Sequence, residues 1–319
     1  MKRIFTSLLF LFSKIYFKIQ YLLFNHIIKG KQAWLIFDRS NIPGFGTNLL
    51  RTYFPIYASE TAKQTFSEEV FAKIEVVIKD NQRIVFEDKI IEEIDQLLQL
   101  PVIEKNNKLP YLDNHFFGIF DAAILGTMMQ VYKPLHIVEI GSGISTRYMN
   151  YFKQKFGLAI KLTCIDPYPR VEIAQVADKL YNLPLELAIK ENAIKLQQGD
   201  ILFMDGSHYV FQGNDTLTFF FNLLPSIPSG VIIHIHDIYL PYDYDNNVSQ
   251  QLWSEQYILA AMLMSGLKDF EILYPAYYES RNTPKIIETL KNVDIKLSSS
   301  DFQIKKSHKE GYSFWIKKK

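Results

Sequence analysis

The chain has 319 residues, a formal net charge of +1 and a hydrophobic content of 48%. This length is sufficient for one large domain and a smaller appended region, and the balanced charge provides no basic field that would attract nucleic acid. The single cysteine, Cys164, excludes an intrachain disulfide and a metal cluster held by several thiolates. The composition therefore favours a cytoplasmic protein without a nucleic-acid partner.

Residues 1–29 are predicted to form an amphipathic helix with a narrow basic stripe. Lys14 and Lys18 interrupt the apolar run before it reaches the roughly 20 residues that a membrane-spanning helix needs, and no small-residue cleavage site follows Phe12. Two interpretations stay open. The helix lies peripherally on the inner face of the membrane with its lysines toward lipid phosphates, or it packs on this protein or a partner chain, including a second copy.

Residues 30–109 are predicted to be an accessory or cap region, so that the whole N-terminal extension is mainly helical. The segment Asn41-Ile42-Pro43-Gly44 indicates a turn, and residues 88–100 have the pattern of a short amphipathic helix with Asp88 as a candidate N-cap. No chemical motif occurs in this region. The position of residues 30–109 leaves three alternative roles: covering the domain that follows, shaping a binding pocket or supporting oligomerisation.

From Pro134 onward, short apolar runs alternate with helical stretches. The five predicted strands are Leu135 to Ile140, Lys161 to Asp166, Leu185 to Ile189, Ile201 to Asp205 and Val231 to His236. A helix is expected through Trp253 to Leu267, followed by strands near Phe270 to Tyr274 and Ser313 to Lys317. This alternation predicts a Rossmann-like α/β domain over residues 110–319, with helices on both faces of the sheet and ligands at the carboxyl edge of the parallel strands.

The first predicted strand ends in a glycine loop that is typical of a cofactor site. Gly141 and Gly143 let the backbone turn closely against a ligand. A dinucleotide site would have a third glycine at position 146, where this chain has Thr146. Glu139 brings a negative charge to the loop, which suits the cationic amino-acid end of S-adenosylmethionine better than a pyrophosphate. NAD is therefore the weaker interpretation.

Acidic and polar residues after the next strands complete the predicted cofactor site. Asp166 ends the second strand, where its carboxylate can accept hydrogen bonds from both ribose hydroxyls. Glu191 and Asn192, which follow the third predicted strand, are placed to meet the adenine edge, although surface loops commonly carry such residues. An isolated Gly-x-Gly would favour an ordinary turn. Its coincidence with Glu139, Asp166 and Asp205 favours a cofactor site instead.

Several segments together resemble one bacterial branch of the class I S-adenosylmethionine-dependent methyltransferases, the methyltransferase domain family 24 branch. They are Asp121-Ala122-Ala123, Val138 to Thr146, Cys164-Ile165-Asp166-Pro167, Gly199 to His208, Gly230 to Ile238 and Glu255-Gln256-Tyr257. The resemblance spans roughly Tyr111 to Tyr278 and implies a seven-stranded methyltransferase sheet. It assigns cofactor contacts to the following residues: Glu139, Gly141, Ser142, Gly143 and Asp166. Residues 281–311 have no counterpart in it.

Two carboxylates and several imidazoles follow the fourth and fifth predicted strands. We expect His208 to act as general base, while Asp205 and Asp237 orient the reacting groups or jointly hold a divalent cation such as Mg²⁺. His236 forms a second candidate catalytic pair with Asp237, for which a helix N-cap is the structural alternative. His234 is assigned to the core.

The expected function is the transfer of a methyl group from S-adenosylmethionine to an oxygen of a small polar acceptor, such as a sugar or a secondary metabolite. Two alternatives remain. One is an NAD-linked oxidoreductase on a similar sheet, which Thr146 disfavours. The other is a non-catalytic scaffold that is recruited to the membrane through residues 1–29 and keeps the fold, against which the complete set of cofactor residues argues.

Overall fold

A computed structural model describes residues 34–41, 46–52, 65–81, 86–114, 116–169, 171–245, 248, 251–298 and 310–319. The chain divides into two compact units, Met1–Thr65 and Phe66–Lys319. The helix predicted over residues 1–29 lies outside the described residues. The division falls inside the predicted accessory region of residues 30–109, because the helices α2 (Glu68–Asn81) and α3 (Glu87–Leu97) belong to the second unit.

The described part of the first unit is a pair of antiparallel strands, β1 (Trp34–Asn41) and β2 (Gly46–Thr52). Asn41 pairs with Gly46, so the chain reverses direction near the predicted turn. These two strands were not predicted, whereas the helices α2 and α3 agree with the predicted mainly helical extension. The run that begins at Trp34 is rich in aromatic and β-branched residues, which favour a strand and which the mixed polar pattern of the region obscured.

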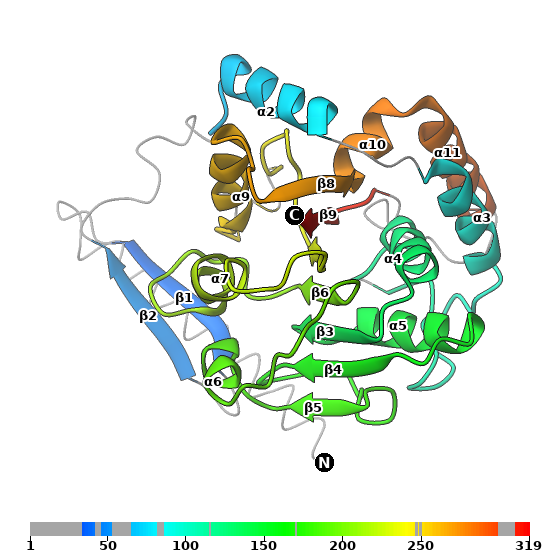
Figure 1. Ribbon diagram of the computed structural model, residues 1–319, viewed down its shortest axis with the longest axis horizontal. Coiled ribbons are helices and arrows are strands. Elements are labelled where there is room, and N and C mark those ends of the chain that lie inside the picture. The colour runs from blue at the N-terminus through cyan, green and yellow to red at the C-terminus, as the bar shows by residue number, and fades with distance from the viewer. Residues whose placement is uncertain are drawn as a thin grey trace, which may run out of the picture. The chain divides into compact units, whose positions relative to one another are not determined.

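The second unit is built on a seven-stranded sheet with the order β5-β4-β3-β6-β7-β9-β8. Its strands are β3 (His136–Ile140), β4 (Lys161–Ile165), β5 (Lys179–Tyr181), β6 (Ile201–Met204), β7 (Ile232–Ile235), β8 (Phe270–Pro275) and β9 (Phe314–Lys318). The first five run parallel, whereas β9 is antiparallel to both β7 and β8. Figure 1 shows β6, β3, β4 and β5 side by side with their arrows pointing the same way. The predicted seven-stranded sheet is confirmed.

Hydrophobic side chains from alternate strand positions enter two separate cores. In β6, Ile201 and Phe203 belong to one core and Leu202 and Met204 to the other. The first core contains residues of α3, α4 (Ile119–Tyr132), α5 (Ile144–Lys155) and α11 (Pro284–Ser298). The second contains residues of α2, α6 (Leu185–Lys190), α9 (Glu255–Met264) and the helical turn η1 (Phe219–Leu223), which follows α7 (Asp215–Thr218). Helices therefore cover both faces of the sheet, as predicted.

The third predicted strand is wrong, because residues 185–190 form helix α6 and the third parallel strand is the shorter β5. Pro184 is the N-cap of α6, and its ring fixes a backbone angle that suits a helix start. Leu185 and Ala188, one helical turn apart, are the buried residues of α6. An apolar run of this length shows no clear periodicity, so the sequence did not distinguish a strand from a helix here.

The N-cap of α3 is Phe86 rather than the predicted Asp88, which lies in the first helical turn.

The start of the last strand, β9, is anchored by the fully buried carboxylate of Asp121 in α4. This carboxylate accepts hydrogen bonds from the backbone N–H groups of Tyr312 and Ser313. α11 and α10 (Ala276–Asn282) occupy the described part of residues 281–311, which matched no known pattern.

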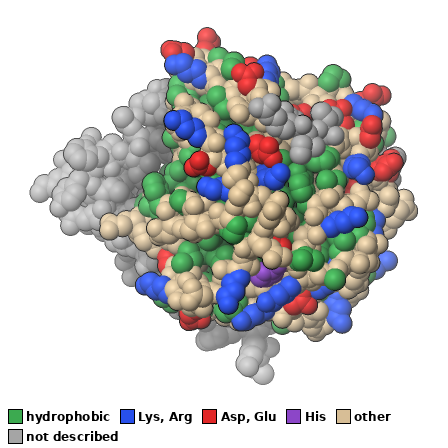
Figure 2. All heavy atoms as spheres, viewed as in Figure 1, with side chains coloured by type: hydrophobic (Ala, Val, Ile, Leu, Met, Phe, Trp, Pro, Cys, Tyr) green, Lys and Arg blue, Asp and Glu red, His purple; other side chains and the backbone are tan. Residues whose placement is uncertain are grey.

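Charge on the visible face of the molecule is mixed. In Figure 2 the Lys and Arg side chains are interspersed with Asp and Glu side chains. Within the described residues, no helix is both long and apolar enough to cross a membrane.

Candidate active site

The glycine loop lies in direct contact with the end of the neighbouring strand β6. Gly141 has a φ of +76°, and its N–H donates to the carbonyl of Ile165 at 3.0 Å. A Cβ atom at this position would lie only 1.7 Å from the carbonyl oxygen of Asp205. Gly143 differs, since a Cβ atom there would meet nothing within 4 Å. The loop therefore needs Gly141 for its own fold and presents open space at Gly143.

Asp166 connects the end of β4 to this loop. One carboxylate oxygen accepts hydrogen bonds from the backbone N–H of Ser142 at 2.8 Å and from its hydroxyl at 3.1 Å. The other oxygen accepts from the N–H of Tyr168 at 2.7 Å. The sequence-predicted residues Gly141, Ser142 and Asp166 are therefore brought together at the carboxyl edge of the sheet.

Glu139 is completely buried beneath the loop. Its carboxylate accepts hydrogen bonds from the hydroxyls of Ser145 and Thr146, both at 2.5 Å, and from the thiol of Cys164 at 3.3 Å. Burial raises the pKa of Glu139 to about 7, although these three hydrogen bonds oppose the shift. Glu139 thus fixes the first turn of α5. Its predicted contact with the cationic end of the cofactor stays a prediction.

This buried carboxyl group makes protein stability depend on pH in a defined window. The raised pKa means that the folded protein binds a proton that the unfolded chain releases above its ordinary pKa of 4.5. Stability is therefore expected to fall by roughly 3 kcal/mol as the pH rises from 4.5 to 7. Glu139→Gln should remove this part of the slope in urea denaturation at a series of pH values. Identical slopes for the two proteins would contradict the assignment.

A second cluster forms around His208, in the segment that follows β6. His208 is buried, has a φ of +65°, and hydrogen-bonds through Nδ1 to the buried carboxylate of Glu255 at the start of α9. The ring of Trp253 packs against the imidazole with centroids 4.3 Å apart. A non-glycine residue with a positive φ is held there by its surroundings, and such strain concentrates at functional sites.

The other imidazole nitrogen of His208 faces two carboxylates. Nε2 lies 3.4 Å from Oδ2 of Asp237 and 3.6 Å from Oδ1 of Asp205. One ligand atom from each of these three residues lies within 4.8 Å of the others, a spacing that could hold a metal ion. Asp237 also has a positive φ, of +55°. The predicted catalytic and metal-binding residues therefore converge.

The charge of this cluster bears on the predicted role of His208. Burial lowers the pKa of His208, but the negative charges of Glu255, Asp237 and Asp205 outweigh burial and raise it to about 10. At neutral pH the imidazole is then a cation and cannot accept a proton. The general-base role, which stays a prediction, requires another positive charge that offsets the carboxylates.

The two histidines at β7 have different surroundings. His234 is fully buried and stacks on Phe203 with centroids 3.6 Å apart, and burial lowers its pKa well below the ordinary value. It is a neutral core residue, as predicted. His236 packs on Phe117, and its Nε2 lies 4.0 Å from Asp237. Burial lowers the pKa of His236, but nearby carboxylates including Asp237 raise it overall.

The structure differs from the sequence prediction at two places near the site. Glu191 and Asn192 are exposed and lie at the end of helix α6, because the strand expected before them is a helix. Their adenine contact stays a prediction. Asn182 follows β5, whose last residue, Tyr181, accepts a hydrogen bond from the N–H of Asp166, so Asn182 now occupies the strand-end position. Glu255 lies in a segment that carries the family resemblance, but nothing local in the sequence links it to His208.

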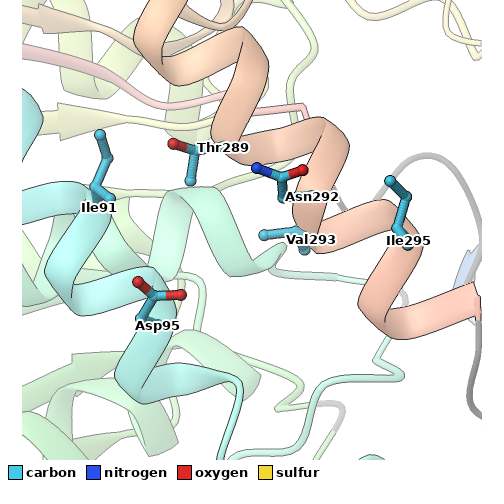
Figure 3. Close-up of a pocket in the computed structure, with 6 residues that line it drawn as sticks. All are labelled: Ile91, Asp95, Thr289, Asn292, Val293 and Ile295. Atoms are coloured by element: carbon cyan, nitrogen blue, oxygen red, sulfur yellow. The ribbon is translucent and has the colours of Figure 1, made fainter.

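A cavity of about 430 Å³ lies elsewhere, between α3 and α11. Figure 3 shows the residues that line it: Ile91, Asp95, Thr289, Asn292, Val293 and Ile295. None of them is a predicted site residue, and the cavity therefore has no part in the site described above.

Comparison with known proteins gives the family of the central segment. Residues 138–238 match the sequence profile of a family described as a methyltransferase domain. No curated protein sequence matches the chain. The matched segment includes both the glycine loop and the His208 cluster.

Solved structures of low sequence identity are also similar. The apo-structure of CmcI has 14% identity and a TM-score of 0.34, covering 48% of this chain and 62% of that one. CmcI with Mg and SAM has 13% identity and a TM-score of 0.34, covering 62% and 70%. The SAH-bound Podospora anserina methyltransferase PaMTH1 has 14% identity and a TM-score of 0.38, covering 80% and 97%. The chain spans less than two thirds of the apo CmcI chain.

Within the seven-stranded sheet, the strand order, the antiparallel direction of β9 and the glycine loop after β3 define a class I methyltransferase fold. Residues 138–238 match the methyltransferase domain family, and enzymes of this class take the methyl group from S-adenosylmethionine.

Proposed function

We propose that the protein transfers a methyl group from S-adenosylmethionine to an oxygen of a small polar acceptor, such as a sugar hydroxyl or a hydroxyl of a secondary metabolite. The observation that carries this proposal is the contact between Gly141 and the carbonyl of Asp205. It places the cofactor loop directly beside the cluster of Asp205, His208 and Asp237. A methyl donor bound at this loop would therefore lie beside groups able to act on a hydroxyl.

The residues of the loop fit S-adenosylmethionine. The open space at Gly143 lets a ligand approach the backbone, and Asp166 presents a carboxylate for the ribose hydroxyls. Glu139 is buried and proton-binding in this structure, and the cationic amino group of the ligand would favour its ionised form. Asn182 and Tyr181, at the end of β5, are candidates for the adenine side of the site.

When bound, S-adenosylmethionine supplies a methyl group on a positively charged sulfur: the carbon–sulfur bond breaks, a carbon–oxygen bond forms to the acceptor, and S-adenosylhomocysteine leaves. The protein aligns the acceptor oxygen with the methyl carbon and removes the hydroxyl proton. Asp205 and Asp237 are the candidates for holding a divalent cation, which would lower the pKa of the hydroxyl and position its oxygen.

Aromatic side chains beside the cluster support a ring-containing acceptor. Tyr239 and Tyr244, which follow Asp237 in the chain, form a small buried cluster with Val248 and with Tyr277 of α10, and Trp253 packs against it. Aromatic walls with a few polar groups are typical of small-molecule pockets. Peripheral membrane contact through residues 1–29 would place the acceptor near a lipid surface, and it stays a prediction.

Titration calorimetry with S-adenosylmethionine, using NAD as the control ligand, tests the donor half of this proposal. We expect saturable binding of S-adenosylmethionine and none of NAD. Incubation with methyl-labelled donor and a panel of sugars and phenols, with a divalent ion or with EDTA, then tests transfer to oxygen. A folded protein that binds no S-adenosylmethionine would instead support a non-catalytic scaffold.

A further inference from the structure

We propose that Nε2 of His208 is the third protein ligand of the divalent ion, that Glu255 positions this imidazole, and that the site therefore prefers a transition ion such as Mn²⁺ over Mg²⁺. This inference rests on the proposed function, since it concerns the ion at the same site. It adds one ligand, one positioning residue and the class of ion.

The distances around Nε2 fit an ion better than direct hydrogen bonds. Separations of 3.4 Å from Asp237 and 3.6 Å from Asp205 exceed the usual N–H···O range of about 2.7–3.2 Å. Neighbouring ligand atoms that each lie about 2.0–2.2 Å from one ion are roughly 3 Å apart in octahedral geometry and roughly 3.4 Å apart in tetrahedral geometry. The two separations from Nε2 therefore suit ligands of a common ion, and the ligand atoms of Asp205 and Asp237 lie within 4.8 Å of each other.

Glu255 determines which nitrogen of His208 faces this centre. Its carboxylate is 1% exposed and hydrogen-bonds Nδ1, so that Nδ1 carries the proton and Nε2 points toward Asp205 and Asp237. A carboxylate behind a histidine in this way fixes the tautomer and strengthens the histidine as a metal ligand.

Backbone hydrogen bonds also hold His208 against the start of α9. The N–H groups of Ser254 and Glu255 donate to the carbonyl of His208 at 2.8 and 3.2 Å. The hydroxyl of Ser254 accepts from the N–H of Val210 at 3.0 Å, and Trp253 packs on the imidazole. The start of α9 and the segment after β6 are therefore joined on both sides of His208, which sets the ring before any ion binds.

The donor set decides the class of ion. Two carboxylates alone suit Mg²⁺, a hard ion that prefers oxygen ligands. An imidazole nitrogen shifts the preference toward transition ions, of which Mn²⁺ is the one that also suits carboxylate ligands. Because His208 is fixed toward Asp205 and Asp237, Nε2 faces the ion position without a change of side-chain conformation, and the ion displaces the proton on Nε2 when it binds.

The test is calorimetric titration of the full-length protein with Mn²⁺ and with Mg²⁺. We expect wild-type protein to bind Mn²⁺ at least about tenfold more tightly than Mg²⁺, and Glu255→Leu to weaken Mn²⁺ binding about 10- to 100-fold. Glu255→Gln keeps an oxygen that accepts from Nδ1 and should lose less. Glu93→Gln, which removes a buried carboxylate paired with Lys155, is the matched control and should bind Mn²⁺ like the wild type.

Pulsed EPR of bound Mn²⁺ provides a readout that does not require a folded variant at position 255. A coupled imidazole nitrogen is expected in wild-type protein and should disappear in His208→Ala. Mn²⁺ bound without a nitrogen signal, or with unchanged affinity in folded Glu255→Leu, would overturn the inference. Binding of S-adenosylmethionine is measured separately. If the inference about the ion fails but the protein still binds S-adenosylmethionine, the proposed function is unaffected. If wild-type protein does not bind S-adenosylmethionine, the proposed function is wrong, regardless of the result with the ion.

Discussion

Gly141→Ala is expected to lower the free energy of unfolding by about 4 kcal/mol or more, or to prevent folding. The added methyl carbon would lie 1.7 Å from the carbonyl oxygen of Asp205 and 2.8 Å from its carbonyl carbon, which are backbone atoms that cannot turn away. The φ of +76° adds a conformational cost of about 1 kcal/mol for a residue with a Cβ atom. Urea denaturation of the purified variant measures the change.

Gly143→Ala is the matched control in the same loop. Its φ of −176° is extended backbone, and nothing lies within 4 Å of the added atom, so stability should change by less than about 1 kcal/mol. The same open space is the proposed cofactor position, and the methyl group should therefore weaken S-adenosylmethionine binding at least about tenfold. Equal stability losses in the two variants would contradict the assigned geometry.

Asp166→Ala is expected to weaken S-adenosylmethionine binding by about 10- to 150-fold, since a hydrogen bond to a charged group contributes about 1.5–3 kcal/mol. The variant loses the proposed acceptor of the ribose hydroxyls and also the carboxylate that holds the N–H of Ser142. Titration calorimetry gives the ratio of dissociation constants.

Asp178→Asn provides the comparison for Asp166→Ala. Asp178 also accepts a backbone hydrogen bond from β4, through the N–H of Leu162, and pairs with Lys153, but it lies at the amino end of the strands. We expect this variant to bind S-adenosylmethionine like the wild-type protein. Comparable losses in both variants would show that general loosening of β4, rather than a ribose contact, accounts for the effect.

Local patterns in the sequence were sufficient for most of the sheet and for the cofactor loop. Apolar runs predicted four of the five parallel strands and both closing strands, and polar turns with Gly, Asp or His marked the carboxyl ends of the parallel ones. Because the carboxyl ends of parallel strands share one edge, the same runs placed Gly141, Asp166, Asp205 and Asp237 together. The shorter strand β5 was missed because the apolar run at residues 185–189 has no clear period, and Pro184 favoured a helix start.

The sequence by itself determined the fold class and the candidate residues at the sheet edge, because strand alternation and turn glycines are local properties. Tertiary structure alone decided which groups meet. Glu255 reaches His208 from a helix 47 residues away, and Gly141 touches the backbone of Asp205 from a different strand. Such contacts depend on how helices and strands pack, and no spacing along the chain encodes them. The charge of His208 follows from the same packing, since three carboxylates from three segments surround one buried imidazole.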